Sequence, residues 1–266
     1  MGIFARVARA GVIAAVVGCA PKPAPAVHWG YTGRSDPGHW AELAPENAAC
    51  GRGRFQSPID LHAVARRLAR PLRFDYRPDR LRIVNNGHTV QVDHQAGSTL
   101  TIAGRTYTLA QYHIHSPSEH TVDGRRFALE LHLVHRHVSG DLAVVGVLID
   151  EGSERGAEGE AIARVWDHLP AHAGEVFTGD ESVNPGVLLP TSLEHYQYHG
   201  SLTTPPCSEN VDWSVLVRPV LMSAEHIAEF RRLYRANARP IQARPDWCLL
   251  AAPHDPQLRD RLNREI

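Results

Sequence analysis

The sequence has no excess of charge of either sign. Its 28 Lys and Arg residues nearly balance its 29 Asp and Glu residues, which gives a formal net charge of −1. This balance argues against a nucleic-acid-binding surface and against a strongly acidic tail. Hydrophobic residues make up 43% of the chain and charged residues 21%, as in an ordinary globular protein, and 266 residues are enough to bury a sizeable core.

Long hydrophobic runs are also missing. The apolar run at the N-terminus, residues 10–17, is too short to cross a bilayer as a stable helix, and no other segment is apolar enough to cross one. Two arginines precede it, and Cys19 and a Pro-rich stretch follow it. The pattern predicts a lipoprotein-like signal segment over 1–19, in which Cys19 carries the lipid, and a Pro-rich linker over 20–27. Secretory cleavage after Ala20 and a single membrane-spanning anchor are the alternatives.

Cysteine is scarce, with four residues in the whole chain. An exported chain permits disulfides. The three cysteines beyond the signal segment, Cys50, Cys207 and Cys248, cannot all pair within one chain. Their spacing alone does not select the pair.

The sequence lacks an internal repeat and an internal linker, so we expect one domain over 28–245. An extension over 246–266 follows, and the sequence does not indicate its role. Short alternating runs bounded by turn residues predict strands; they are 81–84, 89–92, 99–102, 106–109, 129–138, 142–149 and 211–217. Helices are expected only over 160–168 and over 223–235, where Ser223 is a fair N-cap. This distribution predicts a mainly β protein.

Two of the β-like segments carry histidines at positions that favour a metal site. His113 and His115 are two residues apart and therefore share one face of a strand, and His132 lies in a second strand. If these strands are neighbours, three neutral nitrogens converge and leave one open position, as at a catalytic zinc. Gln111 and Glu130 each precede a proposed ligand by two residues, where they can accept a hydrogen bond from its other nitrogen.

A simpler interpretation of these histidines is an alternative to the metal site. The chain has 17 histidines, so a His-x-His pair arises easily by chance. A single His in an apolar strand, such as His132, is usually a hydrogen-bonded core residue. Glu130 favours the metal site, because a carboxylate buried in an apolar strand is costly unless it has partners.

Seven motifs in order along the chain resemble those of the α-class carbonic anhydrases, from His28 to about Gln242. They are Gln56-Ser57-Pro58-Ile59-Asp60, Asn85-Asn86-Gly87-His88, Gln111-Tyr112-His113-Ile114-His115, Ser118-Glu119-His120, Glu130-Leu131-His132-Leu133-Val134-His135, Gly200-Ser201-Leu202-Thr203-Thr204-Pro205-Pro206 and Asn237-Ala238-Arg239-Pro240. The resemblance implies a single domain built on a large twisted, mostly antiparallel sheet of about ten strands with short peripheral helices. It also implies a lyase that hydrates carbon dioxide reversibly to bicarbonate and a proton, with Zn²⁺ as cofactor.

The resemblance further implies roles for individual residues. His113, His115 and His132 correspond to the zinc ligands, and Gln111 and Glu130 to their hydrogen-bond partners. Thr203 corresponds to the residue whose hydroxyl orients the attacking hydroxide while donating to Glu119. His88 corresponds to the proton shuttle, and an exposed His with a pKa near 6.5 is suited to that task at neutral pH. Without the family, Thr203 would be read as part of a turn and His88 as a turn-tip residue.

Further positions match the substrate pocket and the structural parts of the family. An apolar wall for carbon dioxide would contain Val134, Val144, Leu202, Val211 and Trp213, and the water-ordering polar positions would be Tyr31, Asn86, Gln91 and Thr204. His120 and His135 match buried structural histidines. Cys50 and Cys207 match a disulfide found in bacterial members, and Cys248 has no counterpart.

Two other functions are compatible with a chain of this kind. One is a non-catalytic carbonic-anhydrase-like binding domain, although such relatives usually lack one of the three histidines. The other is a periplasmic zinc-binding protein. The expected partners are carbon dioxide and bicarbonate, with no nucleic acid, and contact with a membrane only through a lipid on Cys19. The expected location is the periplasm or cell envelope, and the sequence leaves the oligomeric state open.

Overall fold

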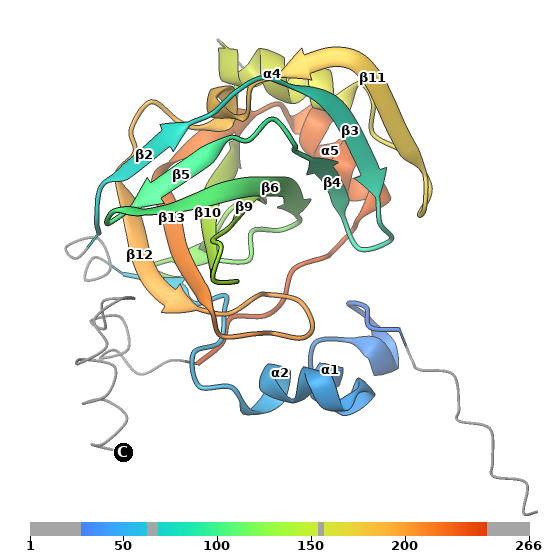
Figure 1. Cartoon of the computed structure of the whole chain (residues 1–266). Helices are drawn as coiled ribbons and strands as arrows, with labels where there is room; N and C mark the ends of the chain where they lie inside the picture. The colour runs from blue at the N-terminus through green and yellow to red at the C-terminus, as the bar shows by residue number, and fades with distance from the viewer. Residues whose placement is uncertain (1–27, 63–68, 154–156, 244–266) are drawn as a thin grey trace, which may run out of the picture.

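The computed structural model describes residues 28–62, 69–153 and 157–243 (Figure 1). The predicted signal segment with Cys19, the linker and the whole extension with Cys248 lie outside the described residues, so these parts and the domain boundaries stay predictions. Within the described ranges, no helix is both long enough and apolar enough to cross a membrane.

The described residues form one ten-stranded sheet with the path β11-β3-β4-β6-β9-β10-β13-β12, to which β5 and β2 are added beside β6. The strands are β2 (Leu72–Asp75), β3 (Asp79–Asn85), β4 (Val90–Asp93), β5 (Thr99–Ile102), β6 (Arg105–His115), β9 (Leu129–Arg136), β10 (Leu142–Glu151), β11 (Val176–Val183), β12 (His195–Gly200) and β13 (Val211–Met222). Neighbouring strands in this sheet are antiparallel except β10 and β13, which are parallel. The predicted fold class is confirmed.

The helices of the described residues are short and lie at the periphery of the sheet (Figure 1). They are α1 (Trp40–Leu43), α2 (Ala49–Arg52), α4 (Ala157–Trp166) and α5 (Ala224–Leu233), with single 3-10 turns η1 (Gly33–Ser35), η2 (Pro45–Ala48) and η3 (Pro185–Leu188). A three-stranded sheet combines β1 (Asp60–Leu61), β7 (Thr121–Val122) and β8 (Arg125–Arg126). In Figure 1, α4 and α5 lie at the upper end of the sheet, whereas α1 and α2 lie at its lower end, beneath the loop between β12 and β13.

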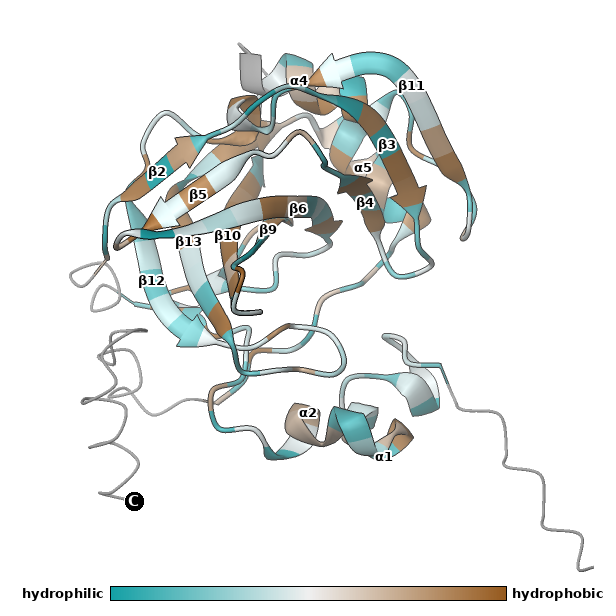
Figure 2. Ribbon diagram, viewed as in Figure 1, coloured by the Kyte–Doolittle hydropathy of each residue, from teal (hydrophilic) through white to brown (hydrophobic). Residues whose placement is uncertain are grey.

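Apolar residues cover both faces of the central strands. Seven consecutive residues of β9 and eight of β10 are buried, a pattern expected of strands that are covered on both sides, whereas the short β5 alternates. One buried cluster includes residues of α4 and α5, such as Trp166 and Phe230. A second cluster includes Val144 and Trp213. Figure 2 shows hydrophobic residues concentrated on the inner strands, while β12 is mostly hydrophilic.

Several predicted elements differ in extent from those observed. The expected strand over 106–109 and the histidine segment form one strand, β6, whose register shifts between Leu109 and Gln111. Strand β13 continues beyond the expected end at residue 217, and α4 ends at Trp166, two residues before the predicted end of that helix. The helix after Ser223 is confirmed, because the Ser223 side chain accepts a hydrogen bond from the His226 amide. Six observed strands were not predicted; they are β1, β2, β7, β8, β11 and β12.

Candidate metal centre

Three histidines converge where β6 lies against β9. His113 lies directly opposite His132 in the antiparallel register, and His115 follows His113 on the same face of β6. The Nε2 atoms of His113 and His115 are 3.1 Å apart, and one nitrogen from each of the three rings lies within 4.8 Å of the others. His115 and His132 are buried, whereas His113 is half-buried. The predicted adjacency of the two strands is therefore correct.

The other nitrogen of each ring meets an atom that can only accept a hydrogen bond. His113 Nδ1 lies 2.8 Å from Gln111 Oε1, His132 Nε2 lies 2.9 Å from Glu130 Oε1, and His115 Nδ1 lies 2.7 Å from the carbonyl oxygen of Asn237. Each of these ring nitrogens must carry the proton and donate it. The unprotonated atoms are therefore His113 Nε2, His115 Nε2 and His132 Nδ1.

Burial keeps these imidazoles neutral. It lowers the pKa of His115 to about 4 and the pKa of His113 well below its ordinary value, and it also lowers the pKa of His132. A metal competes with protons for the same lone pairs, so neutral rings are suited to ligation.

The donor set fits a zinc ion. Zinc–nitrogen bonds of about 2.0–2.1 Å in a tetrahedron place ligand nitrogens about 3.3 Å apart, close to the separation of the two Nε2 atoms. Three imidazoles add no negative charge and leave a fourth position for a small molecule. Thiolate ligands, which favour closed structural sites, are missing from the metal-binding clusters of the described residues.

Glu130 is a fully buried carboxylate that four donors satisfy. Oε2 accepts from the backbone amides of Glu119 and His120 at 2.9 and 2.8 Å, and Oε1 accepts from His120 Nδ1 and His132 Nε2 at 2.7 and 2.9 Å. Burial by itself raises the pKa of Glu130, but His120 and His132 hold it well below its ordinary value. The neighbouring strand needs a glycine here, because a Cβ on Gly146 would lie 2.9 Å from Glu130 Oε1.

Glu119 places a second buried carboxylate beside the three nitrogens. Its Oε1 accepts from the Arg239 amide at 2.8 Å, while Oε2 lies 3.5 Å from His115 Nε2. Burial raises the pKa of Glu119 to about 7, and His132, the Arg239 amide and the Thr203 hydroxyl oppose this rise. The Thr203 hydroxyl is thus near, but Oε2 has no partner in hydrogen-bond geometry among the described residues.

The apolar residues predicted to form the substrate wall gather in one cluster beside the histidines. The sheet register places Val134 opposite Val144, and Val144 opposite Trp213. Val134, Val144, Val211 and Trp213 are buried in this cluster, and Leu202 packs against it. The Trp213 ring lies 4.8 Å from the His132 ring, so the apolar surface directly adjoins the metal-binding face.

The comparisons with known proteins agree with this geometry. A family model described as eukaryotic-type carbonic anhydrase matches residues 35–244. The carbonic anhydrase of Pectobacterium carotovorum is 42% identical over 217 residues, which cover 81% of this chain and 87% of that protein. The carbonic anhydrase of Nostoc sp. is 42% identical over 245 residues, which cover 88% and 90%. The solved α-carbonic anhydrase of Thermovibrio ammonificans, in complex with sulfanilamide, has a TM-score of 0.77 at 38% identity and covers 81% of this chain and 95% of that chain.

This chain belongs to the α-class carbonic anhydrase family. Membership makes it an enzyme of the lyase class, and the resemblance drawn from the seven motifs is confirmed.

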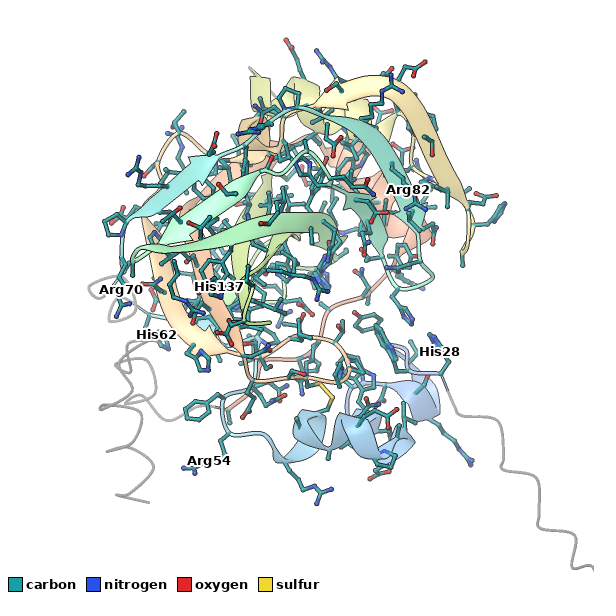
Figure 3. The ribbon with its side chains drawn as sticks, viewed as in Figure 1. His28, Arg54, His62, Arg70, Arg82 and His137 are labelled. Carbon is teal, nitrogen blue, oxygen red and sulfur yellow. A yellow bond between two sulfur atoms is a disulfide. The ribbon has the colours of Figure 1, made fainter. Side chains whose placement is uncertain are left out.

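One expectation for this carbonic anhydrase is wrong. His88 was expected to be exposed with an ordinary pKa, but its ring stacks on Trp29, with centroids 3.6 Å apart and planes 10° apart. The His28 ring is parallel to it at 4.9 Å (His28 is labelled in Figure 3). Partial burial, with a smaller contribution from His28, lowers the pKa of His88 to about 4. The ring is a much weaker base than the sequence suggested.

The predicted polar positions have different surroundings. The Asn86 side chain accepts from the amides of His88 and Thr89, which holds the turn in place. Gln91 lies opposite His113 in the β4–β6 pair. Tyr31 lies edge-on to Trp29, and burial raises its pKa above the ordinary value. Thr204 accepts from the Cys207 amide at 2.9 Å through its carbonyl oxygen.

The predicted Cys50–Cys207 disulfide is present, with the sulfurs 2.06 Å apart, and appears as a yellow bond above α1 and α2 in Figure 3. The structural positions of His120 and His135 also agree with expectation, because both are fully buried. His120 donates to Glu130, and His135 Nε2 lies 2.6 Å from the Tyr76 hydroxyl.

Sequence reasoning missed the residues that complete the site from the C-terminal segment. Asn237 accepts from His115 through a backbone carbonyl, so its side-chain type gives no signal of that contact. Its side chain accepts from the Ser116 amide and donates to the His88 and Ile114 carbonyls. Arg239 was recognised only as part of a motif, with no role assigned. The one signal in the sequence was the family motif Asn237-Ala238-Arg239-Pro240 itself.

Proposed function

We propose that this chain catalyses the zinc-dependent, reversible hydration of carbon dioxide to bicarbonate and a proton. The observation that carries the proposal is the convergence of three unprotonated histidine nitrogens, each with its ring oriented by a hydrogen bond from its other nitrogen. His113 Nε2, His115 Nε2 and His132 Nδ1 would hold the zinc ion. In carbonic anhydrases generally, zinc lowers the pKa of a water ligand to about 7 and so supplies hydroxide at neutral pH.

Thr203 and Glu119 orient the nucleophile in this proposal. A threonine hydroxyl has a single proton to donate. If Glu119 Oε2 accepts that proton, Thr203 can only accept a hydrogen bond from the attacking hydroxide, which turns a lone pair of the hydroxide toward the substrate. The buried Oε2 without a hydrogen-bond partner, close to Thr203, supports this role.

The apolar cluster positions the carbon dioxide. The substrate is apolar and must lie beside the hydroxide without strong polar contacts. Val134, Val144 and Trp213 form a buried surface against the metal-binding face and exclude water from it. Val211 and Leu202 extend the same surface.

His88 carries the product proton to solvent. A ring with a pKa of about 4 accepts a proton from a group with a pKa of about 7 only at an equilibrium cost of about a thousandfold. We therefore propose that His88 shuttles protons after its ring has left the stack on Trp29, where its pKa returns toward the ordinary value.

We propose that the protein works in the bacterial cell envelope after export, held there by a lipid on Cys19. The disulfide supports export, since such bonds persist in oxidising compartments. The bacterial relatives and the basic, apolar N-terminus are consistent with it.

Stopped-flow carbon dioxide hydration by the purified protein, with zinc quantified in the same sample, tests the proposed function. One zinc per chain and hydratase activity that chelation abolishes are expected. One tightly bound zinc with no hydratase activity would instead indicate a zinc-binding protein.

A further inference from the structure

Arg239 is a charged side chain that is only 1% exposed. Its Nη1 donates to Gln56 Oε1 and to the Ser57 carbonyl at 2.9 and 2.8 Å, and its Nη2 donates to the Cys50 carbonyl at 2.8 Å. The guanidinium carbon lies 5.6 Å from the centre of the Trp40 ring. Its Nε has no acceptor among the described residues. A guanidinium is therefore held by neutral oxygens and an aromatic ring, deep in the protein.

Such burial is costly and needs a reason. Burial lowers the pKa of Arg239 to about 10, so the side chain stays charged at neutral pH. The carboxylates of Glu119 and Glu209 favour the charged form, and the hydrogen bonds to neutral oxygens repay only part of the cost of removing a charge from water. A well-packed apolar residue would meet a purely structural need at lower cost.

The backbone of Arg239 acts directly on Glu119. Its amide donates to Glu119 Oε1 at 2.8 Å, which leaves Oε2 toward His115, His132 and Thr203. The orientation of the Glu119 carboxylate therefore depends on where the Arg239 main chain lies.

The Arg239 side chain is also linked to the loop that carries Thr203. Gln56 accepts from Arg239 through Oε1 and donates through Nε2 to the Cys207 carbonyl at 3.1 Å. The Cys207 amide in turn donates to the Thr204 carbonyl at 2.9 Å. These contacts link Glu119 through Arg239, Gln56 and Cys207 to Thr204, which is the chain neighbour of Thr203. The Arg239 amide and the loop that carries Thr203, which both lie near the Glu119 carboxylate, are thus connected by the same chain of hydrogen bonds.

We propose that Arg239, braced by Gln56, is a positioning residue of the reaction, which sets the Glu119 carboxylate in register with Thr203. The inference rests on the proposed function, because Glu119 and Thr203 act on the nucleophile there. The planar fork of the guanidinium matters more than its charge, since it reaches three acceptors from residues 50, 56 and 57 at once. A lysine ammonium is a compact point charge that cannot match this geometry.

The first test uses Arg239→Lys, which keeps the charge and the backbone amide. We expect kcat/KM for carbon dioxide hydration to fall by about 10- to 100-fold, with zinc content unchanged, because small misplacements at a reacting centre cost rates of this order. Arg218→Lys, at an exposed arginine whose Nη1 donates to Thr191 Oγ1, is the matched control and should retain wild-type activity. Wild-type kcat/KM in Arg239→Lys would overturn the inference, whereas an inactive wild-type protein would instead contradict the proposed function.

A double-mutant cycle separates positioning from a general structural role. If Arg239 acts through Glu119 and Thr203, Arg239→Lys should cost less than about twofold when Thr203→Ala is already present, because the two changes disrupt the same unit. Equal losses in both backgrounds would show that Arg239 acts independently of Thr203 and would overturn the inference. Gln56→Met, which removes the amide that braces Arg239, provides the same cycle if Arg239→Lys does not fold.

Amide hydrogen exchange supplies a measurement that does not depend on activity. In the zinc-free protein, the amide of residue 239 should exchange at least about tenfold faster in Gln56→Met and Arg239→Lys than in the wild type, because the main chain of residue 239 is no longer held against its carboxylate acceptor. The exchange rates of amides in the centre of β10 should not differ between the variants and the wild type. An equally protected amide at residue 239 in both variants would contradict the proposed link.

Discussion

The imidazole of His88 stacks on the indole of Trp29, with ring centroids 3.6 Å apart. The two residues are far apart in the sequence, and the contact places the proposed proton carrier against an apolar surface. Partial burial lowers the pKa of His88 to about 4, and His28, which lies parallel to the same ring, adds to the effect. The Asn237 side-chain amide donates to the His88 carbonyl at 3.0 Å, so the backbone that carries the ring is anchored.

We predict that Trp29→Ala raises the pKa of His88 toward its ordinary value of 6.5, because the ring loses its cover. Titration of the His88 C2 proton by NMR measures this, with the exposed His62 as a reference that should not change between the two proteins. In the wild type, the folded pKa lies below the unfolded one, so the unfolded chain binds the proton more readily between pH 6.5 and about 4. The contribution of His88 to stability is therefore complete above pH 6.5 and is lost as the pH falls through this range. An identical titration in Trp29→Ala would contradict the role of the stack.

A related change tests the shuttle itself. His88→Ala should lower turnover at limiting buffer and leave zinc content unaltered, and added imidazole should restore part of the rate because it replaces the missing proton carrier. Rates that do not respond to buffer concentration in either protein would remove His88 from the proton path.

The metal ligands lead to a third prediction. His132→Ala or His113→Ala should lose most of the bound zinc and reduce hydration to background, because two imidazoles no longer complete a catalytic site. Zinc is quantified by mass spectrometry after dialysis, and hydration by stopped flow. His62→Ala is the control, since its ring binds Asp123 at the surface, away from the three ligands. Full zinc stoichiometry in either ligand variant would refute the assignment.

Strand parity was enough to predict the metal-binding face, because it depends only on local geometry. His113 and His115 share a face in any regular strand, and Gln111 remains within reach of His113 despite the register shift that precedes it. The adjacency of β6 and β9 could be stated only as a condition, since pairing across the sheet depends on the whole topology. The parallel pairing of β10 with β13 had no local signal at all.

Long-range contacts account for what the sequence could not reveal. The His115 ring is oriented by the backbone carbonyl oxygen of Asn237, and any residue type would provide that atom. The low pKa of His88 arises from partial burial, and the sequence around Trp29 gave no sign that its ring would stack on His88. The family resemblance identified the residues of the site, but it did not reveal the long-range contacts that orient the His115 ring and bury the His88 ring.

A fourth prediction concerns the orientation of the nucleophile. Thr203→Ala should retain zinc and fold normally, yet lower kcat/KM by about 10- to 100-fold, the range typical of losing a hydrogen-bond partner just outside the metal ligands. Thr106→Ala, at an exposed position of β6, provides the matched control. Unchanged hydration kinetics in Thr203→Ala, measured with zinc content in the same sample, would rule out the proposed orientation.

The disulfide gives a prediction on stability. Cys50 and Cys207 are 157 residues apart, so closing this loop removes conformational entropy from the unfolded chain, by up to about 5 kcal/mol in an ideal chain-entropy treatment. The double variant Cys50→Ala/Cys207→Ala should therefore unfold at lower urea concentration than the wild type, with the same zinc content when folded. A reductant should destabilise the wild type by a similar amount and have no effect on the double variant, which separates loss of the bond from other effects of the reductant. Coincident unfolding curves for the two oxidised proteins would show that the bond does not stabilise this fold.

The Cys50 carbonyl also accepts from Arg239, and that contact survives the substitution because it involves the main chain. The destabilisation measured would therefore report the covalent link and not the loss of the Arg239 contact.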